Sequence, residues 1–218
     1  MPPKFDLDQL PESPDLSWES PLWEKGLKRI AGIDEVGRGA IAGPVAAAVL
    51  LLPLDYNLGA ELDGVNDSKK MTSKARDHWA RKLKELALDY AVGFCSNVEI
   101  DEMGIIPTTK LAIKRALVKL GKAPQHLLID YLELQDCEIP QTSLVKGDAR
   151  SLSIAGASIL AKTARDALMR KYAAEYPHYS FERNKGYATR AHRDALSEVG
   201  PCPIHRMSFR VKGINDIE

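Results

Sequence analysis

The hydrophobic pattern of the chain predicts short strands interspersed with helices. Five short apolar runs are typical of strands, at residues 29–34, 44–52, 90–95, 126–130 and 143–148. Four longer segments are predicted as helices, at residues 73–88, 107–120, 151–176 and 189–199. The tight connection between the first two strands makes them antiparallel neighbours. This order of elements predicts an α/β fold, in which helices pack on a mixed sheet.

Capping residues support the predicted helix boundaries. Thr72 or Ser73 suits the N-cap of the first helix, and Thr189 suits that of the last. Gly121 is expected to end the second helix, because glycine adopts the backbone conformation that follows many helices. Pro177 is expected to stop the third helix, since proline cannot continue its hydrogen bonds.

Charge is distributed unevenly along a chain of zero net charge. Residues 1–27 carry six acidic and two basic residues, whereas residues 141–218 carry 13 basic and 8 acidic residues. A cationic bias of this size is compatible with binding to a nucleic-acid backbone. Residues 1–27 also lack clear periodicity, so we expect an irregular N-terminal extension that holds the domain through Trp18, Leu22 and Trp23.

Composition points to a cytoplasmic protein without a membrane segment. Hydrophobic residues make up 44% and charged residues 28% of the 218 residues, as in ordinary globular proteins. No apolar run approaches the roughly 20 residues that cross a bilayer. The start of the sequence lacks the basic and apolar regions of a signal peptide. The three cysteines are far apart, which favours reduced thiols over disulfides or a zinc site.

Carboxylates stand at the ends of three predicted strands. They are Asp34 and Glu35, Asp130, and Asp148. Four carboxylates at one sheet edge would repel one another unless a divalent cation bound them, and oxygen ligands favour Mg²⁺ or Mn²⁺. Two such ions about 4 Å apart can assist phosphodiester hydrolysis. The alternatives are a chance acidic turn after the first strand and separate salt bridges for Asp130 or Asp148.

A glycine-rich turn, Gly37-Arg38-Gly39, directly follows the first pair of carboxylates. Its glycines are not spaced as in a simple hairpin. A non-catalytic dinucleotide-binding turn is one alternative, but the next glycine, Gly43, is one residue late for that fingerprint. Asp34 and Glu35 would also repel a pyrophosphate.

The motifs together resemble bacterial ribonuclease HII, and the resemblance covers about residues 28–212. The matching segments are residues 32–39, 42–45, 67–70, 146–148, 157–162, 184–187 and 203–209, together with Asp130 and His192. This sequence departs from the common family pattern at Ala40-Ile41, where proline and a larger apolar residue are usual, and at Gly156, where alanine is usual.

The resemblance implies a ribonuclease H-like fold with a five-stranded mixed sheet and a small C-terminal helical region. It divides the chain into an extension (residues 1–27), a catalytic core (28–176) and a C-terminal helical region that contributes to substrate binding (177–218). It implies an endonuclease that cleaves the RNA of RNA–DNA hybrids and cuts 5′ of single ribonucleotides in DNA, leaving 3′-hydroxyl and 5′-phosphate ends. Expected roles are ribonucleotide removal from DNA and RNA primer removal, by a monomer. Ribonuclease HIII is the close alternative, although residues 1–27 are too short for its N-terminal domain.

The resemblance also implies roles for individual residues. Asp34, Glu35, Asp130 and Asp148 match the catalytic, metal-binding set. Gly37, Arg38 and Gly39 match the loop that contacts the ribose 2′-hydroxyl, and Tyr187 matches a residue that stacks on the next deoxyribose. Lys69, with Lys70 and Arg76 nearby, is a candidate for phosphate contacts.

Three further titratable residues carry competing interpretations. Asp166 lies four residues after Lys162 on a predicted helix, which favours a structural ion pair. His192 and His205 suit either proton transfer or, more commonly, a surface or capping role. Tyr187 itself could instead only pack the last helix against the domain.

Overall fold

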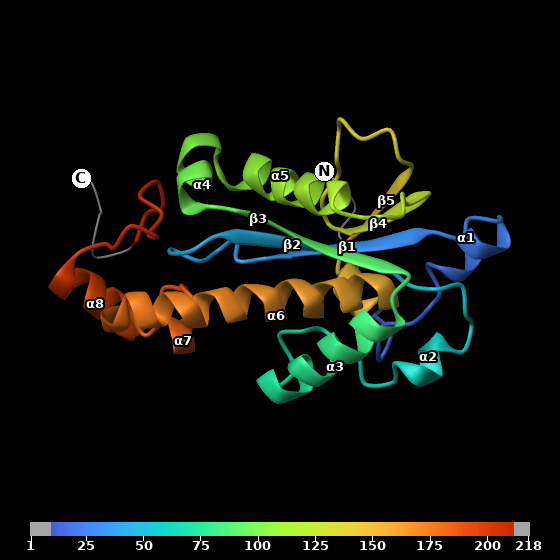
Figure 1. The fold of residues 1–218 in the computed structure, drawn as a ribbon, viewed down its shortest axis with the longest axis horizontal. Coiled ribbons are helices and arrows are strands. Elements are labelled where there is room, and N and C mark those ends of the chain that lie inside the picture. The colour runs from blue at the N-terminus through green and yellow to red at the C-terminus, as the bar shows by residue number, and fades with distance from the viewer. Residues whose placement is uncertain (1–9, 212–218) are drawn as a thin grey trace.

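The computed structural model describes residues 10–211 of the chain and is built around one five-stranded sheet (Figure 1). The strands are β1 (Ile30–Val36), β2 (Val45–Leu51), β3 (Asp89–Cys95), β4 (His126–Asp130) and β5 (Gln141–Leu144). Their spatial order is β3-β2-β1-β4-β5. The β1–β2 and β2–β3 pairs are antiparallel, whereas β1–β4 and β4–β5 are parallel. The predicted five-stranded mixed sheet is confirmed.

Helices cover both faces of this sheet (Figure 1). Helix α6 (Leu152–Glu175) lies along one face, and α3 (Ser73–Leu86) packs on it, while α5 (Ile105–Val118) covers the opposite face. Strand β1 approaches α6 so closely that a Cβ at Gly32 would lie 2.1 Å from the carbonyl carbon of Ser153. A side chain at position 32 would therefore push apart the strand and the helix that flank the acidic cluster described below.

The remaining helices are short and include several that the hydrophobic pattern did not reveal. They are α1 (Ser20–Glu24), α2 (Leu58–Glu61), α4 (Asn97–Met103), α7 (Phe181–Asn184) and α8 (Arg190–Val199), with 3-10 turns at Gly147–Ala149 and Pro177–Tyr179. The predicted N-caps Thr72 and Thr189 are confirmed, because each hydroxyl accepts a backbone hydrogen bond. Gly121 does not cap α5, which ends at Val118 with Lys119 as its C-cap.

The predicted fifth strand is too long in its C-terminal half. Strand β5 ends at Leu144, and Lys146 adopts a left-handed conformation with φ of 58°. The Gly147 N–H then donates to Asp130 Oδ1 at 2.7 Å, which turns the chain into the 3-10 helix. Asp148 therefore lies in a turn that folds back toward β4 and not at a strand end.

The N-terminal extension contains a helix and packs against the core. Trp23 of α1 is 4% exposed and joins the core beneath the sheet, with Trp18 and Leu22 packed beside it. The buried carboxylate of Glu19 accepts hydrogen bonds from the Ser151 hydroxyl at 2.6 Å and from the Ser153 hydroxyl at 2.6 Å. The expected packing by Trp18, Leu22 and Trp23 is thus observed, but residues 20–24 are helical and not irregular. Across residues 10–211, no helix is both long enough and apolar enough to cross a membrane.

Candidate active site

Four carboxylates gather where β1 and β4 end. These strands are parallel neighbours in which Ile33 pairs with Ile129, so Asp34 and Asp130 follow in the same register. Glu35 is next on β1, and the turn at Gly147 brings in Asp148. Asp34 and Asp148 are buried, with 4% and 5% of their surfaces exposed. We call these four residues the acidic cluster.

Burial and the neighbouring carboxylates raise the pKa of two members of the acidic cluster, Asp34 and Asp130. Burial, together with the charges of Glu35 and Asp130, raises the pKa of Asp34 well above its ordinary value. A hydrogen bond from Ser158 acts in the opposite direction and lowers this pKa. Burial and then the charge of Asp148 raise the pKa of Asp130 to about 6, although the Gly147 N–H opposes this. The cluster therefore favours a bound proton or a bound cation.

Two basic side chains partly neutralise the acidic cluster. Arg38 contacts Glu35 with a nitrogen–oxygen distance of 3.0 Å, and Lys69 contacts Asp148 at 3.3 Å. Burial lowers the pKa of Lys69, but the charges of Asp148, Asp34 and Asp67 outweigh burial and raise it. Both cations come from loops, so they can move when another positive charge enters.

The chemistry of the cluster fits a hard divalent cation. All four side chains offer oxygen, and the buried Oε2 of Glu35 has no hydrogen-bond partner among the described residues. Within residues 10–211, no group of three or more acidic, histidine or cysteine side chains is placed to hold a metal ion by itself. Water or substrate oxygens would therefore complete the coordination, as is usual for Mg²⁺.

The glycine-rich turn lies beside the acidic cluster in one open pocket of about 440 Å³. Gly37 has a φ of 93°, and a Cβ there would lie 2.2 Å from Arg165 Nε, so this position requires glycine. The expected site residues that line this pocket are Asp34, Glu35, Gly37, Arg38, Gly39, Lys69, Asp130 and Tyr187. Asp148 is linked to the pocket through Lys69. The structure thus brings the expected catalytic carboxylates, the glycine-rich turn, Lys69 and Tyr187 together, whereas Lys70 does not line this pocket.

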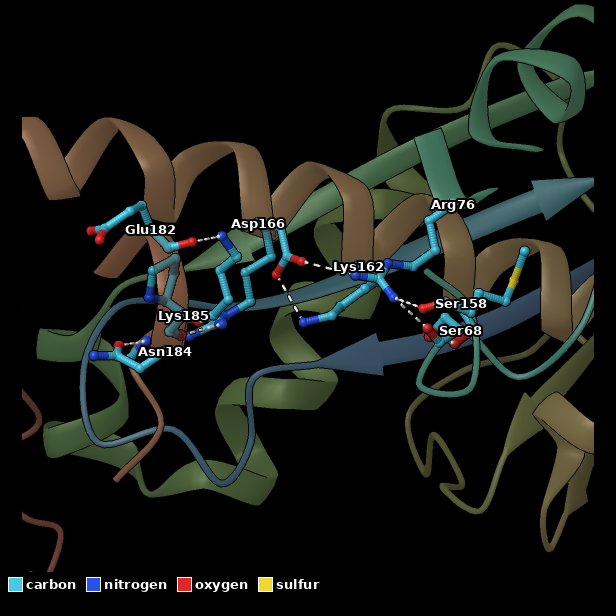
Figure 2. Close-up of polar contacts among 12 residues, drawn as sticks. Ser68, Arg76, Ser158, Lys162, Asp166, Glu182, Asn184 and Lys185 are labelled. Atoms are coloured by element: carbon cyan, nitrogen blue, oxygen red, sulfur yellow. Dashed lines mark hydrogen bonds and ion pairs between the residues drawn. The ribbon is translucent and has the colours of Figure 1, made fainter. Parts of the chain in front are cut away.

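A second, basic pocket of about 480 Å³ adjoins the first and shares Glu35, Lys69 and Tyr187. Figure 2 shows its polar contacts: Ser68 and Ser158 share a hydrogen bond of 2.8 Å, and Arg76 donates to the Ser68 carbonyl oxygen at 2.9 Å. Both serines lie inside the matching motifs, but neither motif showed that they would meet.

Asp166 neutralises the two cations of the second pocket. Lys162 contacts Asp166 at 2.9 Å, and Arg76 contacts it at 3.7 Å (Figure 2). The prediction of a structural ion pair for Asp166 is confirmed. These contacts hold Lys162 and Arg76 in place, whereas the Lys69 side chain is 72% exposed.

The expectation that His192 and His205 have a surface or capping role is wrong as regards the surface, because both are buried and hydrogen-bonded to each other. Their Nε2 atoms are 3.0 Å apart. His192 Nδ1 must carry a proton, since its partner at 2.9 Å is the Tyr187 carbonyl oxygen, an acceptor. His205 Nε2 therefore donates to His192, and its Nδ1 accepts from the Cys202 N–H at 2.9 Å. Burial lowers the pKa of both histidines, that of His205 to about 4. Both side chains are therefore neutral at pH 7.

Two arginines that the sequence did not single out are also buried near the site. Arg165 is fully buried and donates to the carbonyl oxygens of Pro44, Ala42 and Lys185. Arg206 is 3% exposed and lies beneath the glycine-rich turn. Arginine at these positions gives no local signal of burial, because the acceptors are distant in sequence.

Comparison with known proteins identifies the family. A family model described as Ribonuclease HII matches residues 31–212. A ribonuclease HII of Synechococcus sp. (strain JA-3-3Ab) is 48% identical over 196 residues, covering 90% of this chain and 88% of its own length. The chain belongs to the ribonuclease HII family. As a member of the ribonuclease HII family it is a ribonuclease H endonuclease, so the alternative of a non-catalytic nucleotide-binding domain is wrong.

Solved structures confirm the ribonuclease H-like fold. Ribonuclease H2 of Pyrococcus horikoshii OT3 is similar with a TM-score of 0.69 and 26% identity, over 83% of this chain and 93% of that one. The ribonuclease HII of Archaeoglobus fulgidus, solved in a complex with PCNA, has a TM-score of 0.69 at 22% identity, covering 84% of this chain and 96% of that one. Bst-RNase HIII in complex with Mn²⁺ has a TM-score of 0.61 at 21% identity, and the match covers 84% of this chain but 67% of that one.

Proposed function

We propose that this ribonuclease HII family member hydrolyses the RNA strand of RNA–DNA hybrids and cuts 5′ of single ribonucleotides in duplex DNA. The observation that supports this proposal is the shared pocket, in which the acidic cluster adjoins the glycine-rich turn and Tyr187. A nuclease for this substrate needs a phosphodiester-cleaving centre beside a group that detects the 2′-hydroxyl, because that hydroxyl distinguishes RNA from DNA.

The acidic cluster would hold two Mg²⁺ or Mn²⁺ ions. When bound, such ions activate water and stabilise the leaving oxygen of a phosphodiester, which yields 3′-hydroxyl and 5′-phosphate ends. Asp34 and Asp130 lie on adjacent strands, which would fix the distance between these two ligands. Asp148, from the 3-10 turn, would approach the ions from another direction. Lys69 and Arg38 then become free to contact substrate phosphates.

The remaining residues would select the substrate. The backbone of Gly37, Arg38 and Gly39 faces the same pocket as the catalytic carboxylates and would contact the 2′-hydroxyl. Tyr187, from residues 177–218, would stack on the following deoxyribose, so that region contributes to substrate binding while residues 28–176 carry the chemistry. We propose roles in ribonucleotide and RNA-primer removal in the cytoplasm, by a monomer.

The proposal is tested with three end-labelled duplexes of one sequence: all-DNA, DNA with one ribonucleotide, and a uniform RNA–DNA hybrid. We expect cleavage of the last two in Mg²⁺ or Mn²⁺, incision 5′ of the lone ribonucleotide, and no cleavage in EDTA. Cleavage of the hybrid alone would favour the ribonuclease HIII-like specificity. Equal cleavage of the all-DNA duplex would contradict ribose recognition.

A further inference from the structure

The Arg206 guanidinium donates two hydrogen bonds to the glycine-rich turn and a third to the chain that follows it. Its Nη2 donates to the Gly37 carbonyl oxygen at 2.7 Å, and its Nη1 donates to the Arg38 carbonyl oxygen at 2.9 Å. Its Nε donates to the Gly43 carbonyl oxygen at 3.0 Å. No carboxylate in the described part of the chain forms an ion pair with Arg206. Within residues 10–211, all three side-chain hydrogen bonds of Arg206 therefore go to carbonyl oxygens between β1 and β2.

Burying an unpaired guanidinium is costly, which makes this arrangement informative. Burial, and then the nearby charge of Arg165, lower the pKa of Arg206 to about 9, although the charges of Tyr187 and Asp101 oppose this. The group still carries its proton at neutral pH. A neutral side chain could fill this space without the desolvation penalty. The geometry of the three acceptors, which matches a planar fork, is what arginine supplies and lysine does not.

The bonds to Arg206 also decide where the adjacent N–H groups point. All described peptide bonds are trans, and in a trans peptide the C=O and the N–H point in opposite directions. The peptides that join Gly37 to Arg38 and Arg38 to Gly39 turn their oxygens inward to Arg206. Their N–H groups, those of Arg38 and Gly39, consequently point away from the guanidinium.

These two N–H groups are available to a ligand. Neither the Arg38 N–H nor the Gly39 N–H has an acceptor among residues 10–211, although both residues line the pocket that holds the acidic cluster. A Cβ at Gly39 would meet no atom within 4 Å, so the space in front of this peptide is open. Two adjacent, unpaired donors of this kind suit a single oxygen acceptor.

We propose that Arg206 is a positioning residue for ribose recognition, because it holds the Arg38 and Gly39 N–H groups toward the 2′-oxygen of a ribonucleotide. Deoxyribose has no oxygen at this position and leaves both donors unpaired. The inference rests on the proposed function and adds the residue that sets the orientation of the recognition loop.

A matched pair of substitutions separates positioning from general stability. Arg206→Lys keeps the charge but cannot form the three-bond fork. Asp101→Asn is the control, because Asp101 accepts from the N–H groups of Met207 and Ser208 and so anchors the same segment without contacting the glycine-rich turn. Both variants should lower the melting temperature.

Binding is measured in EDTA, which prevents turnover, with the one-ribonucleotide duplex and the all-DNA duplex of the same sequence. We expect Arg206→Lys to reduce the preference for the ribonucleotide by about tenfold, the scale of one or two hydrogen bonds. Affinity for the all-DNA duplex should change less than twofold, and Asp101→Asn should keep the wild-type preference. A folded Arg206→Lys protein with the wild-type preference would overturn the inference.

Hydrogen exchange in the wild-type protein provides a test that does not depend on the variant folding. The Arg38 and Gly39 amides should exchange more slowly with the ribonucleotide duplex than with the all-DNA duplex. Equal exchange with both duplexes would also overturn the inference. A wild type that neither cleaves nor prefers the ribonucleotide duplex would instead contradict the proposed function.

Discussion

The acidic cluster and the glycine-rich turn share one pocket but differ in how their buried charges are satisfied. In the acidic cluster, burial and mutual repulsion raise the pKa of Asp34 and Asp130, and one oxygen of Glu35 has no partner among the described residues. Around the turn, Arg165 and Arg206 each donate three hydrogen bonds to backbone oxygens. The first region therefore needs an added positive charge, whereas the second is already ordered for recognition. Chemistry and specificity should consequently be separable by mutation.

The largest effect is expected at Asp130. Asp130→Asn removes one negative ligand but keeps an oxygen for the Gly147 N–H. We expect turnover to fall on the order of a thousandfold, since cation-assisted stabilisation supplies several kcal/mol to a phosphoryl transition state. Duplex binding in EDTA should persist. Near-wild-type cleavage rates in Mg²⁺ would remove Asp130 from the catalytic set.

The control for Asp130 should be a carboxylate far from the pocket. Asp136→Asn suits this purpose, because the Asp136 side chain is 87% exposed and its ion pair, within residues 10–211, is with the partly exposed Lys114. Asp166→Asn should also remain active, but it would leave Lys162 and Arg76 without their carboxylate partner and lower stability as well.

The next largest effect is expected from the N-terminal extension, which lies outside both the acidic cluster and the glycine-rich turn. Deletion of residues 2–24 should leave cleavage by the folded protein largely intact, because the described part of this segment does not line the pocket. It should destabilise the protein by about 3 kcal/mol or more, the usual loss for one buried tryptophan. Chemical denaturation and single-turnover cleavage measure the two quantities separately. Loss of cleavage in a truncated protein that remains folded would show that the extension reaches the substrate.

Tyr187 tests the recognition region with a smaller expected effect. Its backbone is held independently of its ring, because its carbonyl oxygen accepts from His192 Nδ1 and from the Thr189 N–H. Tyr187→Ala should therefore fold, and should reduce cleavage of the one-ribonucleotide duplex more than cleavage of the uniform hybrid. Stacking contacts of about 1–3 kcal/mol give the upper scale for the loss.

Tyr187→Phe is the matched control, since it keeps the ring and should retain the wild-type ratio of the two activities. Equal losses on both substrates in Tyr187→Ala, together with a lower melting temperature, would show that the ring only packs the C-terminal region against the domain.

The smallest expected effect is on how the stability of the protein depends on pH, because the acidic cluster and the buried histidines should respond to acid in opposite ways. The pKa of Asp130 is raised from 3.8 to about 6, so between these values the folded protein binds more protons and acidification stabilises it. The pKa of His205 is lowered from 6.5 to about 4, so acidification through that range has the opposite effect. Asp130→Asn removes the first contribution and the part of the Asp34 shift that the Asp130 charge causes, but it leaves that of His205.

In EDTA, the melting temperature of Asp130→Asn should therefore fall further on acidification from pH 7 to pH 5 than the melting temperature of the wild type. The difference should be a few degrees, since about 1 kcal/mol moves a domain of this size by roughly 2–4 °C. Parallel curves for the two proteins would show that Asp130 has an ordinary pKa.

The sequence was sufficient for the elements whose pattern is local and long. The β1–β2 hairpin and helix α6 were predicted to within two residues, because apolar runs and capping residues mark them. Helix α4 was missed because its seven residues are separated from α5 only by Gly104, where φ is 79°.

Site residues carried by motifs were found, but the contacts that hold them were not. Asp148 was expected at a strand end, because the left-handed conformation of Lys146 has no clear sequence signal. The burial of Arg206 depends on carbonyl groups 163 to 169 residues away, and that of Arg165 depends in part on groups 121 and 123 residues away. No local pattern can predict such pairings.

Helix α6 sets a fixed spacing among three distant parts of the molecule. Ser151 at its N-cap binds Glu19, Ser158 meets Ser68, and Arg165 holds the loop after the glycine-rich turn. These residues are seven positions apart, so they lie on nearly one line along the helix, about 10 Å from one to the next. Inserting a single residue between Ser158 and Arg165 would rotate the second half of the helix by about 100° relative to the first. The length of this helix is therefore as constrained as its composition, and homologous enzymes can vary its surface residues far more readily than its residue count.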